Sequence, residues 1–206
     1  MIRVFLAVEL GEELRQQIAQ TQQDLKQRLS RDLPKVVRLS WVQPASMHLT
    51  IKFLGDTEEP LVELLRDALE QVVKAHQPIR IPFERLGVFP HPQQPRVLWV
   101  GPSEQWEQGE EAKRLAVLHR AVEDCCQLLD LVPETRPFSP HLTLARIKAG
   151  ARQFGQVLVK SGAMDRPIAL GSLAVESLVL IKSELHPTGS VYTKLCEVNL
   201  KASASY

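Results

Sequence analysis

Met47-His48-Leu49-Thr50-Ile51-Lys52-Phe53-Leu54-Gly55 is the stretch that predicts the fold, because much of it occurs again at His141-Leu142-Thr143-Leu144-Ala145-Arg146. In each copy a histidine precedes a threonine by two residues, with leucine between them and an aliphatic residue after the threonine. Alternation of polar and apolar residues predicts a β-strand with one polar and one buried face. The sequence therefore predicts two similar strands in distant parts of the chain.

Each predicted strand presents one imidazole and one hydroxyl on the same face, because side chains alternate with a period of two. The pairs are His48 with Thr50 and His141 with Thr143. A single histidine in a strand is most simply explained as a surface residue, and a single threonine by its β-propensity. The chain has only 6 histidines, so chance predicts fewer than one His-x-Thr triplet. The repetition therefore favours a functional role for all four residues.

The paired motifs resemble those of the two-histidine phosphoesterase superfamily, and within it the RNA 2′,3′-cyclic phosphodiesterases, historically called 2′-5′ RNA ligases. The resemblance also covers the opening strand at 3–10, the stretches 87–90 and 96–101, and Arg136-Pro137-Phe138 before the second motif. It implies an α+β fold of two pseudo-symmetric lobes, each an antiparallel sheet backed by helices. A central cleft would carry both motifs within a single bilobal domain at 1–206.

The resemblance also implies an activity, which is metal-independent hydrolysis of RNA 2′,3′-cyclic phosphodiester ends to 2′-phosphomonoesters. By analogy, His48 would be the proton donor to the leaving 3′ oxygen and His141 the proton acceptor that activates water. Histidine suits both tasks because its pKa lies close to neutrality. Thr50 and Thr143 would donate hydrogen bonds to the phosphate oxygens, where negative charge gathers. Ligation would be the reverse of this reaction.

Three further residues are candidate substrate contacts. Arg146 suits a phosphate or a base, although its odd offset from His141 requires a strand end or a bulge to bring it to the same face. Lys52 shares the parity of His48 and Thr50, with a solvated lysine as the alternative. Tyr192 offers a stacking surface for a base. Phe53 offers another, but packing in the core explains it better.

The order of predicted elements supports an α+β fold, because helices do not separate every strand from the next. We expect helices after Gly11, after Thr57 and over 110–129, and strands over 79–88, 96–100, 173–183 and 191–200, the last two joined through 186–189. The helical spacing places Gln22 and His119 on solvated faces.

Composition and missing motifs argue against several other classes of protein. A net charge of +1 gives no global basic field, and three cysteines suit neither a disulfide framework nor a zinc site. No signal peptide, membrane span, metal motif or nucleotide-binding glycine loop is present, so we expect a cytoplasmic monomer without cofactor or metal. Two alternatives remain, which are a non-catalytic nucleotide- or RNA-binding module and a phosphodiesterase acting on small cyclic nucleotides or on the 2′-5′ linkage.

Overall fold

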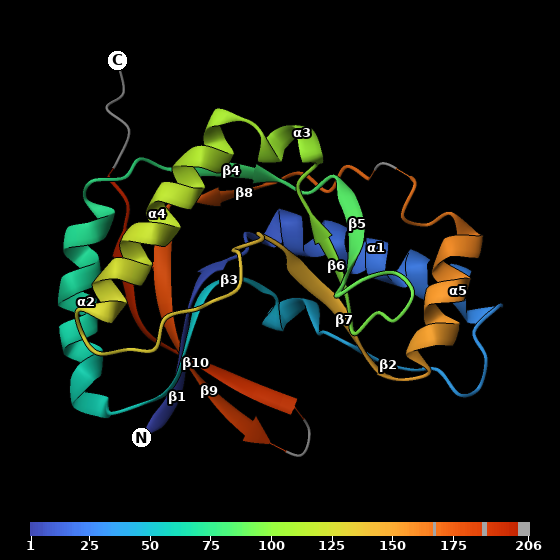
Figure 1. Ribbon diagram of the computed structural model, residues 1–206, viewed down its shortest axis with the longest axis horizontal. Coiled ribbons are helices and arrows are strands. Elements are labelled where there is room, and N and C mark those ends of the chain that lie inside the picture. The colour runs from blue at the N-terminus through green and yellow to red at the C-terminus, as the bar shows by residue number, and fades with distance from the viewer. Residues whose placement is uncertain (167, 187–188, 202–206) are drawn as a thin grey trace.

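The computed structural model describes residues 1–166, 168–186 and 189–201. Part of the predicted turn at 186–189, namely Pro187 and Thr188, lies outside these residues. Figure 1 shows the arrangement of the elements. The strands are β1 (Ile2–Glu9), β2 (Arg38–Trp41), β3 (His48–Thr57), β4 (Ile79–Pro82), β5 (Arg85–Phe89), β6 (Val97–Gly101), β7 (Leu142–Ala149), β8 (Ser172–Val175), β9 (Ser177–His186) and β10 (Gly189–Asn199). The helices are α1 (Glu12–Ser30), α2 (Glu59–Val73), α3 (Glu104–Glu107), α4 (Glu110–Gln127) and α5 (Ala151–Ser161), with a 3-10 turn η1 (Pro44–Ser46).

Two four-stranded antiparallel sheets form the centre of the molecule. The first has the order β10-β9-β1-β3 and the second the order β2-β7-β6-β5, while β4 and β8 pair separately. Each large sheet contains one motif strand, β3 in the first and β7 in the second. The predicted α+β fold of antiparallel sheets and helices is confirmed.

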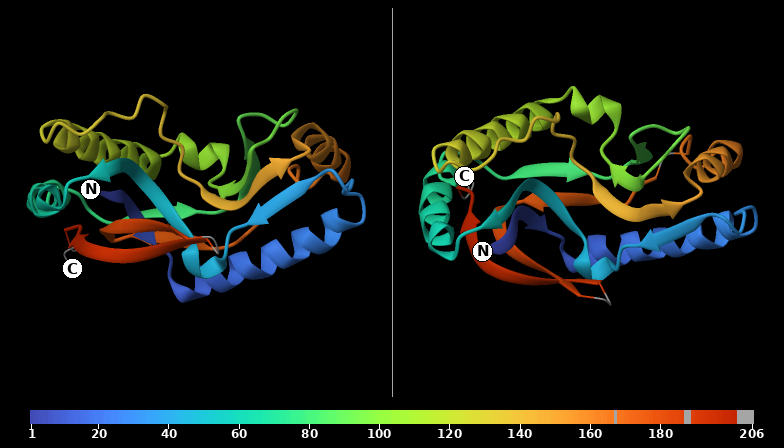
Figure 2. Two further views of the ribbon diagram at one scale, coloured as in Figure 1. Left: turned by 90° about the horizontal axis from the view of Figure 1, so that it is seen from below. Right: turned by 60° about the horizontal axis from the view of Figure 1, so that its bottom comes forward.

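Helices cover the sheets in pairs. On one side α2 and α4 pack together beside the first sheet, and on the other α1 and α5 lie against the second sheet (Figure 1). Figure 2 shows α1 running alongside β2. Each large sheet also takes strands from both halves of the chain, so neither half of the sequence builds one lobe alone.

A β-bulge follows the threonine of each motif. In β3, Thr50 pairs with Ala7 and Lys52 with Leu6, which leaves Ile51 as the extra residue. In β7, Thr143 pairs with Trp99 and Ala145 with Leu98, which leaves Leu144 as the extra residue. An extra residue reverses the alternation of faces beyond it. The bulges therefore decide which later residues share the face of the histidine.

The bulge in β3 makes two predictions wrong. Lys52 does not share the face of His48, because beyond the bulge its side chain points away from the cleft; the residue is 2% exposed and its amine pairs with Glu123 of α4 at 2.7 Å. Phe53 does not pack in the core, because the same reversal turns it outward, where it is 55% exposed. In β7 the bulge returns Arg146 to the face of Thr143, as its predicted use as a substrate contact requires.

Helix side chains contact the backbone at both bulges, and this corrects two further predictions. Gln22 of α1 is buried, and its amide donates to the carbonyl oxygen of Leu144 at 2.9 Å and to that of Val42 at 2.9 Å. His119 of α4 is half-buried and meets the backbone of Ile51. Buried carbonyls need such partners. Neither side chain lies on a fully solvated face.

Two predicted strands are each divided between sheets. Residues 79–88 form β4 and β5, which are separated at Phe83 and Glu84, and residues 173–183 form β8 and β9, which are separated at Glu176. The apolar positions change phase at both breaks, from Phe83 to Leu86 and from Val175 to Leu178, but a change of phase does not reveal which strand pairs with which. The single-domain organisation over 1–206 stays a prediction.

None of the helices within the described residues is long and apolar enough to cross a membrane.

Trp99 of β6 lies across Gly87 of β5, and this packing generates a prediction. A Cβ atom at residue 87 would overlap the indole ring, and Trp99 is 7% exposed, so the ring has little room to move. We expect Gly87→Ala to destabilise the protein by about 1–3 kcal/mol through overpacking. The thermal unfolding midpoint should fall by several degrees; an unchanged midpoint would show that the indole is not held in place.

Candidate functional site

One cleft of about 760 Å³ brings the two motifs together. Its first wall comes from β1, β3 and the β9–β10 hairpin, and its second from β2 and β7. Figure 1 shows where these strands lie. The lining includes both histidines and both threonines of the motifs, His48, Thr50, His141 and Thr143.

His48 is held by its backbone surroundings and by aromatic rings. Its Nδ1 lies 3.0 Å from the carbonyl oxygen of Ser46, and because a carbonyl only accepts, Nδ1 carries the hydrogen. Phe5 stacks on the imidazole with ring centroids 4.6 Å apart, and Tyr192 meets its edge at 5.2 Å. Nε2 is therefore the ring nitrogen left to exchange a proton with a ligand.

His141 is held in the same way. Its Nδ1 donates to the carbonyl oxygen of Ser139 at 2.8 Å, again two residues before the histidine. Phe89 meets the imidazole edge-on at 4.9 Å, and Trp99 is tilted toward it at 6.3 Å. The two imidazoles thus have the same tautomer and the same kind of aromatic support.

Burial lowers the pKa of both imidazoles below the ordinary value of 6.5. The bonds to Ser46 and Ser139 act in the opposite direction, because a carbonyl favours the protonated ring. The guanidinium of Arg146 lies close enough to both rings to lower both pKa values further by charge repulsion. Both histidines are therefore mainly neutral at pH 7 until an anion enters.

The threonine hydroxyls are available to a ligand. Thr50 and Thr143 are half-buried at the cleft, and within the described residues neither hydroxyl has a hydrogen-bond partner. Each lies on the same face as its histidine, as predicted from the strand period. The arrangement can therefore offer two neutral donors beside two imidazoles.

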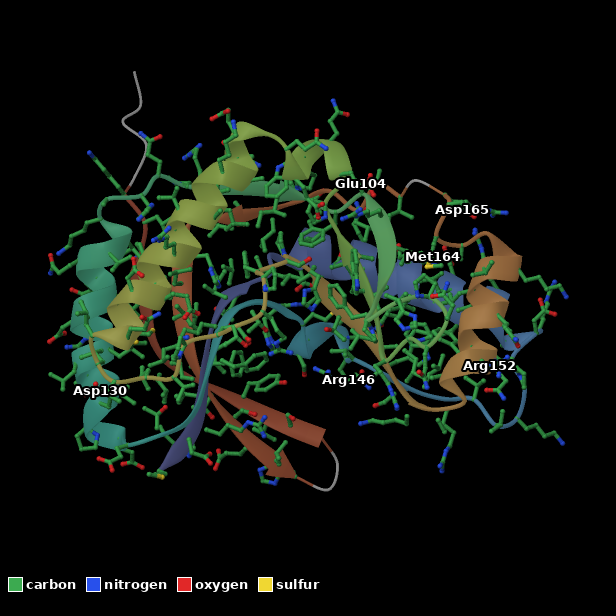
Figure 3. All side chains as sticks on the ribbon, in the orientation of Figure 1. Glu104, Asp130, Arg146, Arg152, Met164 and Asp165 are labelled. Carbon is green, nitrogen blue, oxygen red and sulfur yellow. The ribbon has the colours of Figure 1, made fainter. Side chains whose placement is uncertain are left out.

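The candidate substrate contacts are only partly brought together. Arg146 and Tyr192 line the cleft, and Figure 3 shows Arg146 beyond β7, toward the β9–β10 hairpin. Lys52 lies on the opposite side of the first sheet and is not part of the site. Phe53 does line the cleft, and its ring lies 5.9 Å from that of Phe5.

Residues that sequence reasoning missed give the cleft its charge. Arg3 and Lys148 line it beside Arg146, and no aspartate or glutamate of the described residues does. This contrasts with the net charge of +1 for the whole chain. The sequence contains a signal for Lys148 as a cleft residue, because it follows Arg146 at the strand period. It contains none for Arg3 and Phe5, because the sequence does not show which strand pairs with β1. Such a lining favours an anionic ligand.

Metal-ligating residues do not gather within residues 1–166, 168–186 and 189–201, where no group of three histidine, cysteine, aspartate or glutamate side chains could hold an ion. The expectation of metal-independent chemistry stays a prediction.

Comparison with known proteins gives consistent matches along the chain. The family model described as LigT-like phosphoesterase matches residues 8–99 and 107–192. The RNA 2′,3′-cyclic phosphodiesterase of Methanothermobacter thermautotrophicus is 31% identical over 194 residues, which is 94% of this chain and 96% of the relative. The enzyme of the same name from Thermus thermophilus is 34% identical and covers 97% of this chain and 91% of its own.

Solved structures with the same fold include TT0787 of Thermus thermophilus, with a TM-score of 0.71, 28% identity and coverage of 98% of this chain and 99% of that one. E. coli LigT in complex with 3′-AMP also has a TM-score of 0.71, with 22% identity and coverage of 97% and 98%.

The charge of Arg146 should be measurable in the titration of the two histidines. We expect the NMR titrations of His48 and His141 to give pKa values below 6.5, and both values to rise in Arg146→Gln, which removes a nearby positive charge. Arg152→Gln on α5 (Figure 3) is the matched control and should leave both unchanged. Identical titrations in wild type and Arg146→Gln would contradict this electrostatic arrangement.

Proposed function

Since the chain belongs to the LigT-like phosphoesterase family, we propose that it is an RNA 2′,3′-cyclic phosphodiesterase that opens the cyclic phosphate to a 2′-phosphomonoester. The observation that carries the proposal is the pair of imidazoles, each held through Nδ1 by the carbonyl two residues before it, at one cleft. Relatives about 30% identical over most of their length carry that name.

Two histidines suit this reaction because a proton is removed and another is supplied on opposite sides of phosphorus. In the proposed mechanism His141 takes a proton from water, whose oxygen forms a bond to phosphorus. The bond from phosphorus to the 3′ oxygen breaks, and His48 supplies a proton to that oxygen. The 2′ oxygen keeps the phosphate. The choice of donor and acceptor rests on family resemblance.

The remaining cleft residues would stabilise the charge that develops on the phosphate. Thr50 and Thr143 would donate hydrogen bonds to its non-bridging oxygens, and the Arg146 guanidinium would neutralise them in part. The anionic substrate would also raise the pKa of His48, so that this ring could hold the proton it donates.

The same lining supports RNA as the substrate. Phe53 and Tyr192 lie on the wall that carries His48, and either ring could stack on the base of the terminal nucleotide. Arg3 and Lys148 supply charge for a further phosphate. Reverse 2′-5′ ligation would use the same groups. A cytoplasmic location and a monomeric state belong to this proposal as predictions.

Other functions are less well supported. A binding module without turnover does not require two imidazoles with matched tautomers. A phosphodiesterase for small cyclic nucleotides would use the same groups, and comparing mononucleotide with oligonucleotide 2′,3′-cyclic phosphates distinguishes it.

Removal of either histidine should abolish most activity. With a short RNA ending in a 2′,3′-cyclic phosphate, in excess EDTA, we expect wild type to yield a 2′-phosphate terminus. His48→Ala and His141→Ala should each lower kcat/KM by about 10²–10⁴-fold, the usual contribution of a general acid or base. His91→Ala, an exposed histidine outside the cleft, is the matched control.

Each outcome of this experiment has a distinct meaning. A 3′-phosphate product would reverse the leaving group in the mechanism, and dependence on an added metal would contradict the metal-independent reaction. Near-wild-type turnover by either folded histidine variant would refute the acid–base pair.

The pH dependence of kcat/KM should be bell-shaped with its maximum below pH 6.5. The base must be deprotonated, so activity rises with pH through its pKa, and the acid must be protonated, so activity falls above its pKa. Both pKa values are lowered in the free protein, and the bell moves to lower pH with them. Initial rates at low substrate concentration measure this profile, and a maximum above pH 7 would contradict it.

A further inference from the structure

A buried ion pair lies behind the first sheet, on the face opposite the cleft. The amine of Lys52 is 2.7 Å from Oε2 of Glu123, and the two side chains are 0% and 11% exposed. Placing two charges in the interior is expensive, and replacing such a pair by apolar side chains is often neutral or stabilising. Stability alone therefore does not account for it.

Lys52 belongs to the part of β3 that builds the active site. It lies between Thr50 and Phe53, whose side chains line the cleft, and it follows the bulge residue Ile51 directly. The bulge sends its side chain to the far face, where α4 provides Glu123. A displacement of Lys52 would therefore be transmitted through the backbone to Thr50 and His48.

The same ion pair holds the segment that leads to the second motif. The Lys52 amine donates to the carbonyl oxygen of Val132 at 3.1 Å, and Oε2 of Glu123 accepts from the backbone N–H of Glu134 at 3.3 Å. This segment, residues 131–141, has no helix or strand and ends at His141. Figure 1 shows it passing from the end of α4 to the start of β7.

His119 adds a second attachment to the same segment. Its ring stacks on Phe138 with centroids 4.2 Å apart, and its Nε2 is 3.9 Å from Oε1 of Glu123. That oxygen is buried and has no hydrogen-bond partner within the described residues. The chain from Val132 to Phe138 is thus held at one end by Lys52 of β3 and at the other by His119 of α4, just before the carbonyl of Ser139 that orients His141.

We propose that Lys52 and Glu123 are positioning residues that set the placement of His48 relative to His141. The inference rests on the proposed function and adds to it residues outside the cleft. Directional, charge-assisted bonds can fix two backbone segments more narrowly than apolar packing does. Such placement matters, because a displacement of about 1 Å can cost about 10²-fold in rate.

The test removes both charges together. In Lys52→Met/Glu123→Leu no unpaired charge is left buried, so the melting midpoint should stay close to that of wild type. We expect kcat on RNA 2′,3′-cyclic phosphate to fall about 10- to 100-fold, with KM within about twofold because the cleft residues that bind substrate are intact. Lys113→Met/Glu110→Leu, which removes an exposed ion pair of the same helix, should leave both constants unchanged.

Glu123→Gln is a second variant that keeps the side-chain size and one acceptor oxygen, in case the double variant does not fold. We expect it to lower kcat by a smaller factor than the double variant does, again without a matching change in KM. Wild-type kcat and KM in either folded variant would overturn the proposal and leave the pair a structural one.

A readout without turnover separates this proposal from the proposed function. The imidazole NMR signals and pKa values of His48 and His141 should change in the double variant and not in the Lys113/Glu110 control. Unchanged signals would overturn the positioning role whatever the activity. A wild-type protein inert toward cyclic-phosphate RNA would instead refute the proposed function, and the positioning role in catalysis with it.

Discussion

The single extra residue after each motif threonine is the constraint on which the site depends. A regular strand would send the residues at offsets of two and four from the histidine to one face. Instead, bulges at Ile51 and Leu144 keep His-x-Thr on the cleft face and then bring the residue at offset five there, Phe53 in β3 and Arg146 in β7. The same bulge turns Lys52 inward. Two similar strands therefore give one aromatic and one cationic position.

The backbone of each bulge also contacts a helix side chain, which links the motif strands to the helices. Gln22 of α1 serves Leu144, and His119 of α4 meets Ile51. Both side chains come from positions that helical periodicity alone assigns to water. The buried polar groups of this protein are thus concentrated behind its two motif strands, where they hold irregular backbone in one conformation.

Electrostatics and packing act together on the imidazoles. Aromatic rings bury them and lower their pKa, while carbonyl acceptors fix the tautomer without supplying a negative charge. Arg146 adds repulsion to both rings, which further favours neutral histidines. An incoming phosphate would reverse this balance, because its negative charge favours a protonated ring. The proposed role of His48 as a proton donor depends on this change of protonation.

The sequence by itself determined the fold class and the two motif strands, because local alternation and a repeated triplet carry that information. It also predicted a site at His48, Thr50, His141 and Thr143, which all line the cleft. It also showed that Arg146 required a bulge, but not that one was present. Only the tertiary structure decided that Lys52 is buried, that Phe53 and Arg3 line the cleft, and that 79–88 and 173–183 are each split between sheets. Strand partners and bulge positions are set by contacts between segments distant in the chain, and periodicity along one segment contains no record of them.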